Sequence, residues 1–333
     1  MRTPGCDPSL GVRSAGETGF VLIPVLAALF LLALAAVVLT KSVTLDIRLA
    51  SMSERRAVVE ELADGVTRLA AHHIGVNVPG SGKSGNIRLD GIPQTCRIKH
   101  NVVSISFLDT DGQININRAP IALLQKILSG LGLSDDEARR MAENIIDFRS
   151  RGDESLAGGS KIAAYQGDGH RHGPKYAEFA SVGELDQVIG MTPALLARLK
   201  PLVTVHSRFA TVNPQVASLP VLRALAGAEF GSDSATPEAL DDLRSKIVIP
   251  VEFTYIPRTR GNRTTTSSTY VTRVVVNHPG KAAFARQAVI ELNGNTPMFK
   301  EWTEISLLPQ IPASIDINDL PDCIGGTLGL EAP

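Results

Sequence analysis

The sequence predicts an α+β protein in which one long N-terminal helix packs on an antiparallel sheet and an all-helical segment interrupts that sheet. Three observations predict it. An unbroken apolar run, Phe20 to Leu39, continues into an amphipathic pattern that reaches about His73. Strand-like runs follow, and then more than a hundred residues with helical patterns. The last third returns to strand-like alternation, and this order of elements is typical of α+β proteins.

The N-terminal helix is predicted to have two different parts. At 1.5 Å per residue the apolar run rises about 30 Å, which is enough to cross the hydrocarbon core of a bilayer. Beyond it, apolar residues recur at intervals of three, four and seven and form one stripe on a helix. The stripe consists of Leu45, Leu49, Met52, Val59, Leu62, Val66 and Leu69. A loop dense in Gly, Ser and Pro, residues 75–85, is expected to end the helix.

The remaining elements are predicted from periodicity and turn residues. The expected strands are 86–90, 95–99, 102–108, 113–117, 247–256, 269–277, 285–292 and 301–308. The expected helices are 119–131, 134–148, 182–189, 193–199, 220–228 and 237–245. Ser134 and Ser181 each precede a glutamate by three residues, which predicts two capping boxes. Residues 151–174 are expected to form a long loop, and 258–268 a polar hairpin loop.

The first residues of the chain indicate a targeting signal. Residues 1–19 are polar, and their charges show no excess of either sign. A Sec-type signal would be cut behind Ala33-Leu34-Ala35. A prepilin-type signal would be cut after Gly19, in front of the apolar run, and would leave Phe20 as the first residue. Because the apolar run continues past Ala35, the second interpretation is favoured.

Pro24 is the fifth residue after the expected cut. Most prepilin-like proteins have a glutamate there, whose carboxylate is thought to meet the free amino terminus of a neighbouring subunit. An unpaired amine in an apolar filament core is costly, so a subunit without the acid is a poor repeating unit and suits a filament end. The alternative interpretation is a simple kink in a membrane helix.

The three cysteines are Cys6, Cys96 and Cys323. Cleavage after Gly19 would remove Cys6 and leave an even pair. In an oxidising compartment Cys96 and Cys323 could then form a disulfide. The alternative is two unrelated buried thiols, since the sequence does not show whether the two lie close together.

Few residue patterns point to chemistry. With 33 basic and 34 acidic residues, the net charge of −1 argues against nucleic acid held by bulk electrostatics. No nucleophile–base pair stands out, so no enzyme is predicted. Residues 188–199 resemble half of a helix-hairpin-helix motif, but Thr192 replaces its second glycine, and a packing module is favoured over a DNA contact.

Acidic residues suggest at most calcium as a cofactor. Asp109, Asp111 and Gly112 resemble the start of a calcium loop, but Arg118 stands where an acid is required. Asp316, Asp319 and Asp322 form a denser group beside Cys323. They bind Ca²⁺ or are simply solvated, and the second interpretation is favoured.

Together these features resemble the minor pseudopilin K family of type II secretion systems, also called general secretion pathway protein K. Four stretches carry the resemblance: the junction Gly19-Phe20 with its non-acidic fifth residue, 108–117, 146–149, and 179–205 continuing to 212–214. Phe148 departs from the family, because tryptophan is usual at that place. The long leader is also unusual.

The resemblance implies a pilin-like domain interrupted by a helical domain with helix-hairpin-helix-like (SAM-like) elements. The implied parts are a leader (1–19), a transmembrane and assembly helix (20–40), a first pilin-like part (41–117), a helical insertion (118–245) and a second pilin-like part (246–333). It also implies cleavage after Gly19 and methylation of Phe20 by a prepilin peptidase. The protein would then be anchored in the inner membrane by a single span, with its globular part in the periplasm.

The implied function is non-enzymatic. A protein of this family sits at the tip of the pseudopilus, joins other minor pseudopilins through its N-terminal helix and helps to start assembly and protein export. Contacts with the outer-membrane secretin or exported proteins would follow from such a position, and some members bind Ca²⁺, which favours the Asp316 group slightly. Two alternatives stay open: a Sec-exported helix-hairpin-helix receptor for DNA, and a minor pilin of a type IV pilus.

Overall fold

A computed structural model describes residues 22–77, 87–227, 236–255, 259–260, 263–264, 269–277, 283–294, 296–305 and 317–323. Of residues 42–52, 55, 77, 259–260 and 263–264 it describes the backbone alone. The chain divides into two compact units, one up to Arg55 and one from Arg56 onward.

The first described element is helix α1, Leu22–Asn77. Its segment Leu22–Lys41 has a mean hydropathy of 3.0, and none of it is buried by the rest of the protein. The expected helix from Phe20 to about His73 is therefore confirmed for its described residues and extends one turn further. Pro24 is the third residue of the described part of this helix.

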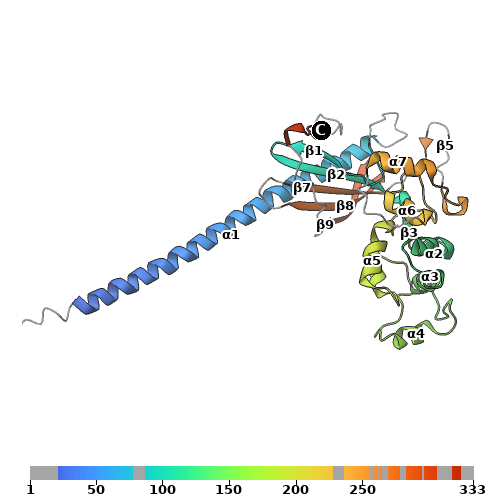
Figure 1. The fold of residues 1–333 in the computed structure, drawn as a ribbon, viewed down its shortest axis with the longest axis horizontal. Coiled ribbons are helices and arrows are strands. Elements are labelled where there is room, and N and C mark those ends of the chain that lie inside the picture. Colours follow the sequence, from blue (N-terminus) through green and yellow to red (C-terminus); the bar gives the residue numbers. More distant parts are fainter. Residues whose placement is uncertain are drawn as a thin grey trace, which may run out of the picture. The chain divides into compact units, whose positions relative to one another are not determined.

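The second unit contains a five-stranded antiparallel sheet with the order β1-β2-β7-β8-β9 (Figure 1). Its strands are β1 Gln94–Ile98, β2 Asn101–Asp109, β7 Thr269–Asn277, β8 Phe284–Asn293 and β9 Thr296–Glu304. Strand β2 pairs directly with β7, although more than 150 residues separate them in the sequence. The mixture of helices and antiparallel sheet expected from the sequence is confirmed.

The last turns of α1 pack on one face of this sheet. Val59, Ala63, Val66, Ala70 and Ile74 recur every three or four residues and are all buried. They share one apolar core with residues of β2, β7 and β8, namely Val103, Ile105, Phe107, Val274, Val276, Ala288 and Ile290. Successive side chains of a strand point to opposite faces, so the residues between these lie on the face of the sheet away from α1.

One edge of the sheet is covered by the segment that ends at Cys323. The Arg97 backbone N–H donates to the Pro321 carbonyl at 2.8 Å, and the Cys323 N–H donates to the Arg97 carbonyl at 3.0 Å. Cys96 and Cys323 form a disulfide with their Cα atoms 5.1 Å apart. The disulfide therefore joins the two cysteines that would remain if cleavage after Gly19 removed Cys6.

Between β2 and β7 the chain forms mainly helices. These are α2 Ile121–Gly130, α3 Asp135–Arg149, α4 Lys161–Gly167, α5 Pro193–Leu199, α6 Leu219–Ala226 and α7 Pro237–Lys246, with short 3₁₀ helices at Thr110–Gly112, Val182–Gln187, Lys200–Leu202 and Val251–Phe253. The two-residue strands β3 Ile114–Asn115 and β4 Val203–Thr204 pair in parallel, and β5 Thr259–Arg260 pairs with β6 Arg263–Thr264.

The helices have an apolar core of their own. Leu123, Leu128, Ile145 and Leu222 are among its fully buried members. Helices α2 and α6 cross so closely that a Cβ atom at Gly130 would lie 2.0 Å from the Ala224 carbonyl oxygen. Only glycine fits that crossing.

Several expected elements differ from the structure. The expected strand 247–256 is wrong: Pro250, which has no N–H to donate, precedes a 3₁₀ helix, and Val248 is 89% exposed. The expected strand 113–117 shrinks to the two residues of β3. For the expected strand 86–90, residues 87–89 are irregular and Asp90 forms a single bridge to Leu108.

The expected loop 151–174 contains helix α4. The Ser160 hydroxyl caps it by accepting from the Ala163 N–H at 3.1 Å. The expected strand 301–308 corresponds to β9, which begins earlier, at Thr296; residues 306–308 lie outside the described part. Within 258–268, the described residues form the β5–β6 pair, as the polar hairpin predicts.

The two predicted capping boxes have different outcomes. Ser134 and Glu137 form a capping box at the start of α3, which confirms the first. The second is wrong, because Ser181 makes no capping hydrogen bond and the segment after it is a 3₁₀ helix. The Glu184 carboxylate instead accepts from the Ala180 N–H at 3.1 Å and from Lys175 at 2.7 Å.

Candidate functional site

The turn after β2 ties the sheet to the helical segment. Asp109 accepts a hydrogen bond from the Asp111 N–H at 2.9 Å, and Asp111 accepts one from the Ser207 hydroxyl at 2.9 Å. The Asn213 N–H donates to the Asp111 carbonyl at 2.7 Å. Both carboxylates are buried. Their observed role is structural, and they join segments that lie about a hundred residues apart.

Two asparagines in the same stretch bind backbone groups far along the chain. Asn115 donates to the Ser207 carbonyl. Asn117 makes a reciprocal pair with the backbone of Phe179, donating at 2.9 Å and accepting at 2.7 Å. These amides therefore fix the segments around Phe179 and Ser207 beside β3.

The segment 146–149 holds the loop that follows α3. Phe148 stacks on Phe179 with ring centroids 4.8 Å apart. Asp147 accepts from the Ser155 hydroxyl at 2.7 Å and lies 3.8 Å from the buried Lys161 ammonium. Its charge therefore closes the loop onto α4.

Arg149, at the end of the same segment, donates to the carbonyls of Ile116 and Ala119. Burial lowers the pKa of this guanidinium from its ordinary value, and it stays protonated because an arginine pKa starts so high. Phenylalanine at 148 fills the place expected for tryptophan by stacking on Phe179.

The half-motif at 188–199 packs on α3. The Asn144 amide donates to the Ile189 carbonyl at 3.0 Å, and Val188, Leu195 and Leu199 are buried. Thr192 caps α5 by accepting from the Leu195 N–H at 3.2 Å. The threonine that replaces the second glycine thus has a capping role, and the segment packs on α3.

The other predicted site residues are distributed as follows. Gly19, Phe20 and Asp316 lie outside the described residues. Asp319 is exposed, and Asp322 lies 3.2 Å from Arg97 in an ion pair. The described part of the chain contains no group of three or more His, Cys, Asp or Glu side chains placed to hold a metal ion.

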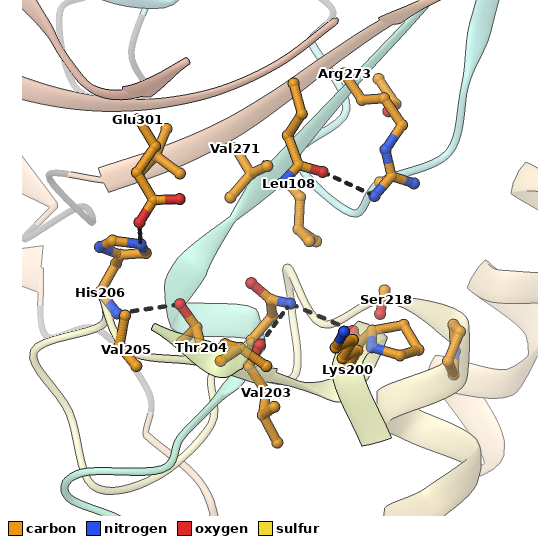
Figure 2. Close-up of a pocket in the computed structure, with 18 of the residues that line it drawn as sticks. Leu108, Lys200, Val203, Thr204, Val205, His206, Ser218, Val271, Arg273 and Glu301 are labelled. Atoms are coloured by element: carbon orange, nitrogen blue, oxygen red, sulfur yellow. Dashed lines mark hydrogen bonds and ion pairs between the residues drawn. The ribbon is translucent and has the colours of Figure 1, made fainter. Parts of the chain in front are cut away.

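A cleft of about 650 Å³ lies between the sheet and the helical segment. Its sheet wall is the face opposite α1. Figure 2 shows Leu108, Val271 and Arg273 on this wall, and Thr204, Lys200 and Ser218 on the other. The sequence did not predict this cleft, because its walls meet only through strand pairing between distant segments.

The cleft carries a bridge between its walls. The His206 ring lies 3.0 Å from the Glu301 carboxylate of β9. The Gln113 amide donates to the carbonyls of Pro201 and Val203, each at 3.3 Å, and so fixes the helical wall. These contacts hold the cleft in a defined shape.

Comparison with protein families decides the identity of the central stretch. The family model described as type II secretion system (T2SS), protein K, matches residues 99–208. Those residues are similar to the type II secretion protein K family. The resemblance noted in the sequence is confirmed, and the protein K stretch contains the buried turn at Asp111, the segment 146–149 and the hairpin at 188–199.

The chain was also compared with curated protein sequences and with solved structures. No curated protein sequence matches the chain. Among solved structures, the chain is similar to one in the crystal structure of the GspK-GspI-GspJ complex from the enterotoxigenic Escherichia coli type 2 secretion system. The identity is 14%, the alignment covers 76% of this chain and 95% of that chain, and the TM-score is 0.49.

Proposed function

We propose that this chain is a minor pseudopilin of a type II secretion system and acts by assembly, without catalysing a reaction. One observation carries the proposal beyond the family match. Helix α1 begins with a segment that is apolar on all sides and exposed, and it ends with a stripe buried on an antiparallel sheet. A helix that is apolar all round is satisfied by lipid or by other apolar helices.

The proposed maturation starts from the polar leader 1–19. Cleavage after Gly19 and methylation of Phe20 leave the apolar segment 20–40 at the new N-terminus, anchored in the inner membrane. The globular part then lies in the periplasm, an oxidising compartment in which the bond between Cys96 and Cys323 persists.

The proposed domain organisation follows the sheet. Parts 41–117 and 246–333 form one pilin-like domain, and 118–245 is an insertion into it. The direct pairing of β2 with β7 supports this division, because it brings the two ends of the insertion together. The separate apolar core of the helices is consistent with an inserted unit.

Pro24 supports a place at the pseudopilus tip. Without a carboxylate at this position the helix offers nothing to the amino terminus of a following subunit. Immunogold labelling of pseudopili from cells that overproduce the major subunit should mark filament ends alone. Labelling along the filament length would contradict the tip position.

Co-purification tests the assembly role. The full chain, tagged after Pro333, is co-produced with the other minor pseudopilins of the same system and extracted in mild detergent. We expect those proteins to co-purify, to be lost from the double variant L29R/L32R and to be retained by the exposed control variant R118Q. Co-purification with type IV pilus proteins instead, or specific retention of DNA, would favour one of the two alternative functions.

A further inference from the structure

The sheet wall of the cleft is ordered in two rows that run across the strands. Leu108 pairs in register with Val271, and Val271 with Val289, so one row is apolar across β2, β7 and β8 and ends at Glu301 on β9. The next row is polar and consists of Ser106, Arg273, Gln287 and Thr303. Neighbouring strands lie about 4.8 Å apart, so each row spans roughly 10–15 Å. A short extended segment of polypeptide has this length and this division into apolar and polar sides.

Arg273 is a cation among neutral neighbours. Its register partners are Ser106 and Gln287, and its guanidinium donates to the Gln287 side chain at 3.0 Å. It forms no ion pair with any other residue that the structure describes. Desolvation lowers its pKa from the ordinary value, but a guanidinium stays charged at neutral pH. Its fork of N–H groups matches a carboxylate in two parallel hydrogen bonds.

The opposite wall supplies further donors. Helix α6 begins behind Ser218, which is 9% exposed and whose hydroxyl makes no capping hydrogen bond. Among the described residues no partner is found for this hydroxyl, and it lines the cleft. The dipole of α6 favours an anion at this place, and Leu219 and Val221 have N–H groups in its first turn, whereas Pro220 between them has none. Lys200 lines the same cleft and forms no ion pair within the described part of the chain.

Both acids in the cleft have side-chain partners. Asp90 lies 2.7 Å from Arg88 and 3.4 Å from Arg244, and Glu301 is paired with His206. Figure 2 shows Arg273, Ser218 and Lys200 towards one end of the cleft and the Glu301–His206 pair towards the other. The cleft therefore has an excess of unpaired positive charge at one end.

We propose that this cleft binds an extended, largely apolar peptide segment of another protein through a carboxylate. The carboxylate is held between Arg273 and the start of α6, and apolar side chains of the segment lie on the row Leu108, Val271 and Val289. The volume of about 650 Å³ suits a ligand site, since such sites range over about 300–1,000 Å³. The carboxylate is either a C-terminus or an Asp or Glu side chain.

Three fluorescein-labelled peptides test this proposal on the purified full chain in detergent. The first, Gly-Val-Leu-Val-Leu, has a free C-terminus; the second is the same peptide with an amidated C-terminus; the third is amidated and contains a glutamate in place of the last leucine. Fluorescence anisotropy measures binding. We expect the first or third peptide to bind at least about tenfold more tightly than the second, as a charged hydrogen-bonded pair implies. Which of the two binds identifies the source of the carboxylate.

Two variants locate the site. R273Q should lower the affinity for the acidic peptide by about tenfold or more, and S218A should lower it by a smaller factor. R118Q, which lies outside the cleft, should leave the affinity unchanged. Unchanged circular dichroism and melting temperature show that the variants are folded. Three results would overturn the proposal. They are equal binding of all three peptides, no binding up to about 1 mM peptide, and unchanged binding by R273Q.

This inference is independent of the proposed assembly role. The peptide experiment uses one purified chain and no partner pseudopilin, so its failure would leave the co-purification result intact. Loss of assembly would equally leave the peptide binding unaffected.

Discussion

The two parts of helix α1 show how one continuous helix can have two different environments. From Leu22 to Leu39 every side chain is apolar and exposed. From Val59 to Ile74 the apolar residues form a single stripe, and that stripe is buried on the sheet. The second part finds its partner within the chain. The first part is apolar on all sides, so it requires lipid or the helices of other subunits.

Charges placed in the first part should have the largest effect. The double variant L29R/L32R introduces two cations, each costing about 2.5–3.5 kcal/mol at the centre of a membrane helix. We expect the protein to leave the membrane fraction after carbonate extraction. The matched control A57R/V58R changes two exposed residues just before the buried stripe and should stay in the membrane. Equal retention of both variants in the membrane fraction would show that membrane anchoring does not depend on the apolar character of the first part.

A cavity between the second part of α1 and the sheet should have the next largest effect. Ile74 is 2% exposed and packs in the core between α1 and the sheet. I74A should lower the free energy of unfolding by about 2–5 kcal/mol. Urea denaturation of the full chain in detergent, followed by the fluorescence of Trp302, the single tryptophan, measures it. V58A, at an exposed position, should change stability by less than about 0.5 kcal/mol. A similar loss in both would mean that α1 is not held by this stripe.

The ion pairs of Arg286 should contribute less. Its guanidinium, 9% exposed, lies 2.6 Å from Asp64 and 3.1 Å from Glu60 on α1. D64N leaves the buried guanidinium with one weaker partner, and we expect a loss of about 1–3 kcal/mol in the same denaturation experiment. E61Q changes an exposed neighbour and serves as the control. An unchanged midpoint for D64N would remove the electrostatic contribution from the account of helix docking.

The exposed pair at the start of the second unit should matter least. Arg56 lies 2.8 Å from Glu304, and both side chains are about half exposed. R56Q should cost less than about 1 kcal/mol, and salt should reduce the difference further. Denaturation at low and high ionic strength measures it, and a salt-independent loss above that value would indicate a buried role for Arg56.

The sequence predicted well what depends on local patterns. The bounds of α5, Pro193–Leu199, and of β7, Thr269–Asn277, agree with the predicted ranges. Helix α4 was missed although its signals are local. Ser160 precedes it as a cap, and Lys161 and Tyr165, four residues apart, are both buried. The many glycines around it concealed this short pattern.

The cleft and the buried polar turn could not be predicted in the same way. The apolar row of the cleft depends on the register Leu108–Val271–Val289, which pairing across a long insertion sets. Asp111 was tested as a calcium ligand because local spacing suggested it. Its hydrogen bond from Ser207 comes from a residue about a hundred positions away. The spacing of residues in the sequence does not predict contacts between such distant segments.

The central claim is that the apolar part of α1 is exposed as a new N-terminus by cleavage in front of it. Intact-mass measurement of the full chain purified from membranes tests this most directly. We expect the mass of a chain that begins at a methylated Phe20, without Cys6 and with two hydrogens fewer than the reduced chain, because Cys96 is bonded to Cys323. A chain that begins near Ala36, behind the apolar run, would contradict it.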